Sequence, residues 1–531
     1  MKFIKTFLQD YNTIIRIGAV SFIIETAVWF FGMGNVNLHF IFMIPGLVCF
    51  IYIFSNWKAS QGDLDLYANR LTKRLLTVSP RLFIILLIIV FGIAWGLKYT
   101  ALYFGFGLKC YDVGIYNNLA DNLANGYKLY SSILQRSHLG EHFSPIMFVF
   151  APLYKIWPGH HWLLFVQLVA YLSSPFFIYL LAKQIISDKN TQKIAGLLLC
   201  VFWFFSRPMA AAMNYPFHPC TISVPFIFWA FYFLEKEKWV HAYIILIFLL
   251  TFKENLTLVW MGFGSYLFVV KRDRIQGTLM LLAGSVVGIL LIKALFPYFR
   301  GDSWGHLDRI GPLADLPQKG LYFAELLFPF LFLPLIFWKF GIISFPAISI
   351  NLIAKRPQQY SFMYHYDDII AALLVISFLL SIEKLTKKKN VLNNLHRKFI
   401  FVLAILVALM IDIKPSPIRS FWEYRPKKVH FELMRDLDRL EHFSDDRLLY
   451  LQSLLVPHMN RYKQTVLPLY IDDYAGFPYK QGSLIVLSRV INPSGIHDFE
   501  QCISDLESRK DKFAKINRFD HLIVYKVLKN E

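Results

Sequence analysis

Long apolar segments recur along the chain and are separated by short stretches rich in polar and charged residues. A helix of about 20 mostly apolar residues spans a bilayer, and a shorter one suffices where flanking side chains reach the interface. The pattern therefore predicts an all-α polytopic membrane protein with about thirteen transmembrane helices. We expect these helices near residues 13–32, 38–55, 82–104, 161–182, 194–206, 221–235, 240–252, 256–270, 277–297, 323–338, 340–354, 368–383 and 399–413.

Clusters of Lys and Arg occupy alternate connections between the apolar segments. Cytoplasmic loops of membrane proteins carry an excess of these two residues. Alternation of the spans then places every basic cluster, together with the N-terminus, on the cytoplasmic side. The basic segments are 56–81, 183–193, 271–274 and 384–398. The loops expected on the outer face are 105–160, 207–220, 253–255, 298–322 and 355–367.

The last part of the chain has a different pattern. Residues 414–531 lack long apolar runs and show short alternating runs between charged helical stretches. Such a pattern is typical of strands that alternate with helices. We therefore predict a small extracytoplasmic α/β domain over 414–531. A transmembrane module with its outer loops would cover 82–413, and a two-helix addition with a cytoplasmic loop would cover 1–81.

Composition supports the membrane interpretation and excludes a soluble enzyme. Of the 531 residues, 56% are hydrophobic and 17% are charged, whereas soluble domains carry about 25% charged residues. The formal net charge of +19 would also suit a nucleic-acid-binding protein. The basic residues, however, lie in short clusters between apolar runs, as in cytoplasmic membrane loops. We expect membrane lipid as a partner and no nucleic acid.

The first outer loop carries the densest cluster of polar residues. Asp112 follows the span 82–104 closely, near the outer interface. A carboxylate at that place can act as a general base towards an acceptor hydroxyl. It can also cap the helical pattern that follows it, since Asp is a preferred N-cap residue. The two roles are compatible, and the residues alone leave both open.

The same loop ends with a group of potential metal ligands. His138 and His142 share a face if the segment is helical, and Glu141 lies between them. This arrangement would suit a divalent metal ion. Gly140 and Pro145 oppose a regular helix, so a hydrogen-bonded turn is the alternative. No cofactor is certain on this basis.

Basic side chains in the outer loops suit a lipid phosphate. Arg207, Lys253 and Arg356 lie in three different loops, and cations at the interface bind anionic headgroups. Each can also be an ordinary surface charge. Lys253 and Glu254 can alternatively form a self-neutralising pair at a helix corner.

The last outer loop before the span 368–383 is both aromatic and polar. It contains Tyr364 and His365 within the segment 355–368. Such a composition suits a loop that contacts a substrate. It equally suits the aromatic belt that membrane proteins place at the interface.

Five short motifs, taken in order, resemble the DUF2079 family of bacterial membrane proteins. The resemblance runs from about residue 85 to 380, with a weaker echo at 455–458. Those proteins in turn resemble the GT-C superfamily of polytopic glycosyltransferases, to whose usual module the first two helices would be an addition. The motifs are Asp112-Val113-Gly114-Ile115-Tyr116, Gly140-Glu141-His142-Phe143-Ser144-Pro145, Phe217-His218-Pro219, Lys253-Glu254 and Tyr364-His365-Tyr366.

The resemblance implies a function. GT-C enzymes take a sugar from a polyprenyl-phosphate donor whose phosphate lies at the outer interface. The implied acceptor is a glycan, lipid or protein of the cell envelope, and the implied location is a bacterial inner membrane. Asp112 would activate the acceptor hydroxyl. Glu141 would assist it, by hydrogen bonding or by holding a metal together with His138 or His142.

The resemblance also implies a set of substrate contacts. Basic side chains would neutralise the phosphate leaving group, where charge develops, and two histidines, His218 and His365, would line the sugar pocket. The implied substrate-binding residues are His138, His142, Arg207, His218, Lys253, Glu254, Arg356, Tyr364 and His365.

Two other functions fit a polytopic chain. A transporter or flippase for a lipid-linked or anionic solute would carry charges at mid-span and paired repeats, whereas this sequence has few charges within its spans and no repeat. A non-catalytic assembly protein would use the outer domain to bind a partner. We therefore expect the glycosyltransferase and keep these two functions as alternatives.

Overall fold

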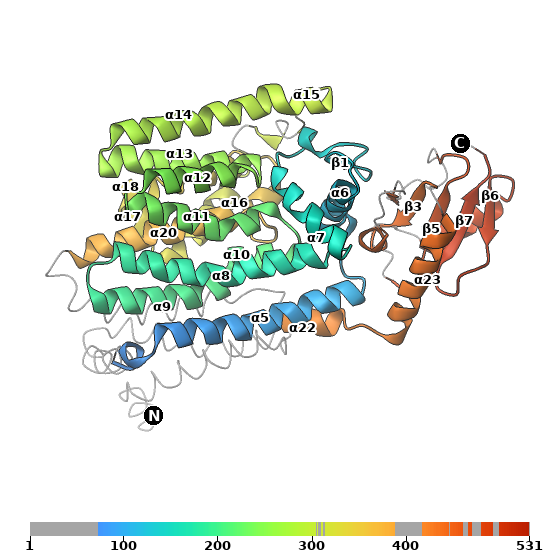
Figure 1. Ribbon diagram of the computed structural model, residues 1–531, viewed down its shortest axis with the longest axis horizontal. Coiled ribbons are helices and arrows are strands. Elements are labelled where there is room, and N and C mark those ends of the chain that lie inside the picture. Colours follow the sequence, from blue (N-terminus) through green and yellow to red (C-terminus); the bar gives the residue numbers. More distant parts are fainter. Residues whose placement is uncertain are drawn as a thin grey trace, which may run out of the picture.

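Most of the chain forms a bundle of long helices, and a small sheet lies beyond one end of it (Figure 1). The computed structural model describes residues 73–303, 305, 309–311, 314–387, 417–444, 447–459, 466–469, 479–491 and 499–529. Its helices are α5 (Pro80–Phe104), α6 (Ile115–Ala124), α7 (Phe150–Ile156), α8 (His161–Ile185), α9 (Lys189–Phe205), α10 (Arg207–Asn214), α11 (Pro219–Glu235), α12 (Trp239–Leu250), α13 (Thr257–Tyr266), α14 (Arg274–Leu290), α15 (Phe296–Arg300), α16 (Leu316–Leu327), α17 (Leu333–Ile336), α18 (Trp338–Gly341), α19 (Phe345–Leu352), α20 (Asp368–Thr386), α22 (Pro417–Glu423), α23 (Lys428–Ser444) and α24 (Phe499–Ser508).

Several of these helices can cross a membrane, as the hydrophobic pattern predicts. Within the described residues, the long apolar ones are Pro80–Phe104, His161–Ile185, Lys189–Asn214, Arg274–Arg300 and Asp368–Thr386. The helices α11 and α12 are apolar but shorter. The core of the bundle lies around α11, which packs against α8, α12 and α20. The expected spans 13–32, 38–55 and 399–413 lie outside the described residues.

The two expected spans 323–338 and 340–354 are not continuous helices. The chain instead forms α16, the short turn η8 (Phe328–Phe330), α17, α18 and α19. Leu331 and Phe332 adopt left-handed φ angles of 52° and 53°. Prolines explain the breaks, because Pro329, Pro334 and Pro346 each stand in the first turn of a new element. Proline lacks the N–H donor that would continue the preceding helix.

The connections gather at two opposite ends of the bundle. Segments expected on the cytoplasmic side meet one another: Ser187 N donates to Glu383 Oε2 at 3.0 Å, and Lys193 Nζ donates to Leu76 O at 2.5 Å. The loops expected on the outer face converge at the other end, where they line one cavity. Helices that cross the membrane in alternating directions would place the loops in these same two groups. Which end faces the cytoplasm stays a prediction from the positive charge.

The tail contains a five-stranded mixed sheet in the order β4-β3-β5-β7-β6. Three of its strands run parallel, β4, β3 and β5. All residues of β3 and β5 are buried, as expected for strands covered on both faces. The strands are β3 (Leu449–Gln452), β4 (Val466–Leu469), β5 (Leu484–Leu487), β6 (Phe513–Ile516) and β7 (Ile523–Val527), and the first outer loop holds a two-stranded hairpin, β1 (Tyr130–Ser131) and β2 (Arg136–Ser137).

The tail contacts the first outer loop through η10 (Val456–His458), the turn that follows β3. Asn117 of α6 donates through Nδ2 to Pro457 O at 3.1 Å and accepts from the Tyr154 hydroxyl at 2.7 Å. The His458 ring lies 4.2 Å from the ring of Phe106. The sheet therefore supports the segment that precedes and includes α6.

Candidate active site

A cavity of about 620 Å³ lies at the end of the bundle where the expected outer loops meet. All five of these loops contribute to its wall. Its volume falls within the range of about 300–1,000 Å³ that is usual for ligand-binding pockets. The predicted site residues that line it are Asp112, His138, Glu141, His142, His218, Lys253, Glu254, Arg356 and His365. We call it the central cavity.

Asp112 lies between α5 and α6 with an unusual backbone conformation, φ 65° and ψ −89°. Left-handed φ values are rare for residues other than glycine, and such strain gathers at functional sites. The N-cap alternative is not what the structure shows, because Gly114 occupies the N-cap position of α6 and no side chain caps it. The Asp112 carboxylate contacts His218 instead, with Oδ1 3.1 Å from Nε2.

The Asp112–His218 pair is poised to accept a proton. Burial raises the pKa of Asp112, and the charges of His365, Lys253 and His142 lower it in part. Burial also holds the pKa of His218 well below 6.5, so its ring is neutral near pH 7. A neutral ring beside a carboxylate donates its N–H from Nε2. The His365 ring stacks on that of His218, with centroids 3.2 Å apart.

A buried amide holds the His218 loop in place. Gln167 of α8 accepts from the backbone N of His218 at 2.8 Å and donates to the Tyr99 hydroxyl at 3.1 Å. Tyr99 in turn donates to Met213 O. Gln167 was not among the residues predicted for the site. Its signal was an amide side chain inside an apolar span, where polar side chains are expensive and often functional.

Among the described residues, no hydrogen bond or ion pair joins Lys253 to Glu254. Glu254 instead contacts His142, with 2.9 Å between Oε1 and Nδ1, and accepts from the backbone N of Phe143 at 3.0 Å. Burial alone would raise the pKa of Glu254, but the charge and hydrogen bond of His142 and the charge of Lys253 lower it to about 2. Lys253 is left as a buried cation on the cavity wall.

The Glu141 carboxylate forms ion pairs and is therefore not a free acid or base. Its Oε1 lies 3.1 Å from Arg136 Nη1 and 2.6 Å from Arg300 Nη1. Gly140 allows the approach of Arg300, since a Cβ there would come within 3.2 Å of the Arg300 backbone. Two guanidinium groups therefore fix this carboxylate and tie the first outer loop to α15.

The three candidate metal ligands do not converge. The Glu141 carboxylate is held by arginines, and His142 is held by Glu254. His138 is buried against Tyr116, ring to ring at 5.3 Å, and burial lowers its pKa to about 3. Within the part of the chain that the structure describes, no three His, Cys, Asp or Glu side chains are arranged to hold a metal ion. These residues do not fit a divalent metal.

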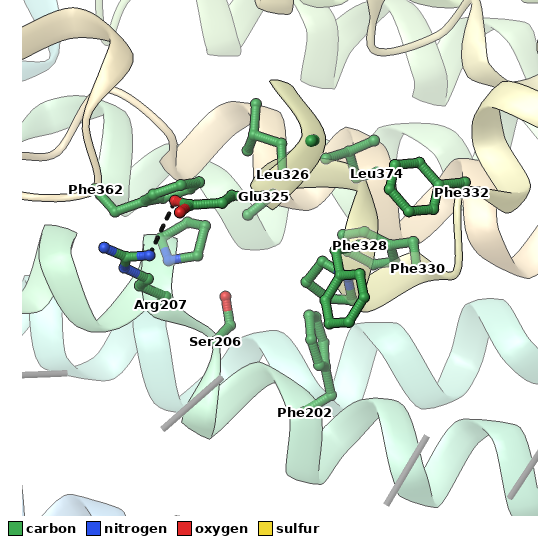
Figure 2. A pocket seen from close by; sticks show the side chains of 14 residues that line it. Phe202, Ser206, Arg207, Glu325, Leu326, Phe328, Phe330, Phe332, Phe362 and Leu374 are labelled. Atoms are coloured by element: carbon green, nitrogen blue, oxygen red, sulfur yellow. Dashed lines mark hydrogen bonds and ion pairs between the residues drawn. The ribbon is translucent and has the colours of Figure 1, made fainter. Parts of the chain in front are cut away.

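Two predicted residues lie away from the central cavity. Arg207 begins α10 and forms an ion pair with Glu325 of α16 at 3.1 Å, on the wall of a second cavity (Figure 2). Tyr364 packs against Tyr215, with ring centroids 5.2 Å apart, and is absent from the cavity wall. The sequence placed both residues at the correct end of the bundle, although Arg207 lies in a helix and not in a loop. It could not show which way their side chains point.

The structure adds residues that the sequence analysis missed. Arg309 and Asn351 line the central cavity. Asn351 donates to Asp367 Oδ1 at 3.1 Å, and the Tyr322 hydroxyl donates to the same oxygen at 2.5 Å. Burial raises the pKa of Asp367 to about 8, so this carboxyl is largely protonated at neutral pH. The signal for Asn351 was again a polar residue within an apolar run.

Fold and site together define a polytopic helical membrane protein with a polar cavity at one end of its bundle, lined by an Asp–His pair and a buried lysine. A family model described as a predicted membrane protein, DUF2079, matches residues 103–448. The chain belongs to this family.

Solved structures of ArnT from Cupriavidus metallidurans resemble the fold. The structure bound to undecaprenyl phosphate has a TM-score of 0.50 and 12% sequence identity, over 83% of this chain and 97% of that one. The structure in the apo state has a TM-score of 0.48 and 12% identity, over 81% and 96% of the two chains. At this identity the likeness concerns the fold alone. No curated protein sequence matches the chain.

Proposed function

We propose that this protein is a membrane glycosyltransferase of the GT-C type, which moves a sugar from a polyprenyl-phosphate donor to an acceptor on the outer face of a bacterial inner membrane. The observation that carries the proposal is the contact of Asp112 with His218 in one cavity with Lys253. A base and a phosphate-binding cation are the two groups that such a transfer needs. The likeness in fold to ArnT, whose structure was solved with bound undecaprenyl phosphate, supports a polyprenyl-phosphate donor.

Each residue of the site has a different role in the proposed reaction. Asp112 accepts the proton of the acceptor hydroxyl while the oxygen bonds to the anomeric carbon of the donor sugar. The bond from that carbon to the phosphate oxygen breaks, and polyprenyl phosphate leaves with an additional negative charge. Lys253 and Arg356 line the same cavity and stabilise that charge. His218 orients the Asp112 carboxylate by its N–H donor.

Glu141 takes a different role from the one that the family resemblance implies. Its carboxylate is neutralised by Arg136 and Arg300, so it is a poor proton acceptor. We assign it to positioning the first outer loop. The second cavity holds Arg207, which we therefore leave out of phosphate binding in the central cavity.

The test is a transfer assay with the full chain in lipid nanodiscs. A panel of polyprenyl-phosphate sugars is supplied with candidate acceptors, and products are followed by mass spectrometry. Asp112→Asn keeps the shape and removes the base, so the rate should fall by about 10²–10⁴-fold. Asp273→Asn is the matched control, because Asp273 caps α14 away from the cavity and Asn caps equally well.

The outcomes separate the possibilities. Turnover that survives in Asp273→Asn and is lost in Asp112→Asn supports the proposal. Equal turnover in native protein and Asp112→Asn contradicts the role of Asp112. Donor binding without transfer to any acceptor contradicts the transferase and favours transport or an assembly role.

A further inference from the structure

A second cavity, of about 350 Å³, lies between α9, α10, α16 and α20 (Figure 2). Its wall is mainly apolar, with Phe202, Phe328, Phe330 and Phe362 among the side chains that face it. Its size lies at the lower end of the range for ligand-binding pockets, about 300–1,000 Å³. None of the residues proposed above for transfer lines it.

Three polar side chains interrupt the apolar wall: Ser206, Arg207 and Glu325. Ser206 is 1% exposed and its hydroxyl has no hydrogen-bond partner within the described structure. Figure 2 shows this hydroxyl directed into the cavity, below the Arg207–Glu325 pair. A buried hydroxyl without a partner has lost the hydrogen bonds that it makes in water. The Ser206 hydroxyl therefore favours an occupant that can hydrogen-bond to it.

The Arg207–Glu325 pair lies at the edge of the cavity and is partly open to solvent. The two side chains are 38% and 39% exposed, and the guanidinium packs over the Phe362 ring at 4.7 Å. A guanidinium group has five N–H donors, and one nitrogen is engaged by Glu325. The remaining donors can take an anionic group beside Ser206.

The cavity lies at the depth of the outer interface. The 17 residues of α9 rise about 26 Å from Lys189 to Ser206, close to the hydrocarbon thickness of about 30 Å. Ala371 and Leu374 line the cavity three and six residues into α20, or about 5 and 9 Å below its outer end. The apolar part of the cavity thus reaches into the outer leaflet.

One side of the cavity faces lipid. Phe328 lines it and is 42% exposed. Leu321, Leu335 and Ile336 lie on the same stretch, α16 to α17, and each is more than half exposed. An apolar surface of this kind on a membrane protein meets acyl chains. A lipid chain can therefore enter the cavity from the bilayer.

We propose that the second cavity binds a phospholipid of the outer leaflet, with one acyl chain among the phenylalanines and the headgroup phosphate hydrogen-bonded to Ser206 and Arg207. Hydrogen-bond donors at the edge of an apolar wall select a lipid that carries a phosphate over one that does not. This lipid is distinct from the sugar donor of the central cavity, so the inference does not depend on the proposed reaction.

The two cavities share walls, which gives the lipid a route to influence the site. Phe362 lines the second cavity, and His365, three residues on, lines the central one. Likewise Ala371 faces the second cavity while Ile370 faces the central one. An occupant that orders Phe362 also orders the loop that carries His365.

The test measures lipid binding by native mass spectrometry of the full chain in detergent, titrated with phosphatidylglycerol or with diacylglycerol of matched acyl chains, which lacks the phosphate. The native protein should bind one phosphatidylglycerol about tenfold more tightly than diacylglycerol, as one charge-assisted hydrogen bond to the phosphate predicts. Ser206→Ala should weaken phosphatidylglycerol binding by a similar factor. Without lipid the same variant should be at least as stable as the native protein, because an unpartnered hydroxyl is gone.

Two further variants guard against misfolding and non-specific charge effects. The double variant Arg207→Gln, Glu325→Gln should lose the preference for phosphatidylglycerol. Its control, Lys271→Gln with Glu235→Gln, removes another ion pair of 3.1 Å at the opposite end of the bundle and should keep the preference.

Three results would overturn the inference. They are no preference of the native protein for phosphatidylglycerol, unchanged binding by Ser206→Ala, and displacement of the lipid by excess polyprenyl phosphate. The last result would assign the cavity to the donor chain and leave the proposed transfer intact. Failure of the transfer assay, conversely, would not alter the lipid measurement.

Discussion

The two cavities lie at the same end of the bundle and share α20 and the loop before it, yet they differ in chemistry. The central cavity gathers Asp112, His218 and Lys253 around a polar space. The second is lined mainly by aromatic and aliphatic side chains, with one ion pair at its edge. The difference follows from the sequence. Charged residues at the turns between helices line the central cavity, whereas a stretch of phenylalanines interrupted by prolines lines the second cavity. Neighbouring volumes in one bundle can therefore suit a reaction and a lipid chain.

The comparison is tested most strongly by removing the buried cation of the central cavity in one variant and the ion pair of the second cavity in another. Lys253→Gln removes the buried charge that we propose stabilises the leaving phosphate, so kcat/KM for sugar transfer should fall by about 10²–10³-fold. Arg207→Gln with Glu325→Gln changes the other cavity and should lower kcat/KM by less than about threefold. The measurement is steady-state transfer in nanodiscs of fixed lipid composition. Equal losses in the two variants would mean that the cavities act as one site.

A smaller effect is expected at the hydrogen bond that orients the base. His218→Leu removes the N–H donor of the Asp112 carboxylate, and loss of a hydrogen bond to a charged group should slow transfer about tenfold. Because Asp112 works as a carboxylate, activity falls as the pH drops through its pKa, which lies above 3.8. Removing a donor to the charged form raises that pKa further. The acid limb of log kcat against pH should therefore move to higher pH.

His218→Gln is the control for this prediction. Its amide can restore an N–H donor to Asp112, so both the rate and the acid limb should return towards those of the native protein. An acid limb that stays in place in His218→Leu would show that His218 only fills space beside His365.

The sequence predicted the features that depend on residues close together in the chain, and it failed for those that depend on partners far apart in the chain. Alternation of charge placed Asp112, His218 and Lys253 in loops on one side, because that rule needs only the order of spans and their basic flanks. The helices that formed as expected, such as α5 and α8, are long segments in which apolar residues predominate. The stretch 323–354 was mistaken for two spans because hydropathy weighs composition and not the missing N–H of proline.

The remaining errors concern partners distant in sequence. Arg207 was expected beside the donor phosphate, but its partner Glu325 is 118 residues away and draws it to the second cavity. Glu141 was expected to assist Asp112 by hydrogen bonding or by holding a metal, but its carboxylate forms an ion pair with Arg300 on α15. Gln167 holds the His218 loop across 51 residues. Periodicity and local motifs carry no information on such pairings, which depend on how the helices pack.

The smallest effect is expected at Asp367, which lies between the two cavities. It accepts from Asn351, which lines the central cavity, and from Tyr322 of α16, the helix that carries Glu325. Burial raises its pKa to about 8, whereas in the unfolded chain the ordinary value of 3.8 applies. Between these values the folded state binds the additional proton, so stability falls as pH rises. Asp367→Asn keeps the Oδ1 acceptor and removes this titration.

The variant should therefore gain in melting temperature over the native protein as pH rises from 5 to 8, by a few degrees, and the gain should level off above pH 8. Thermal unfolding in one detergent at each pH measures it, with Asp273→Asn as a control for a cap outside both cavities. A difference between variant and native protein that does not change with pH would mean that Asp367 is ionised in the folded state. The wall between the cavities would then contain a buried charge, and Arg207, whose charge lowers the Asp367 pKa, would be the cation that stabilises it.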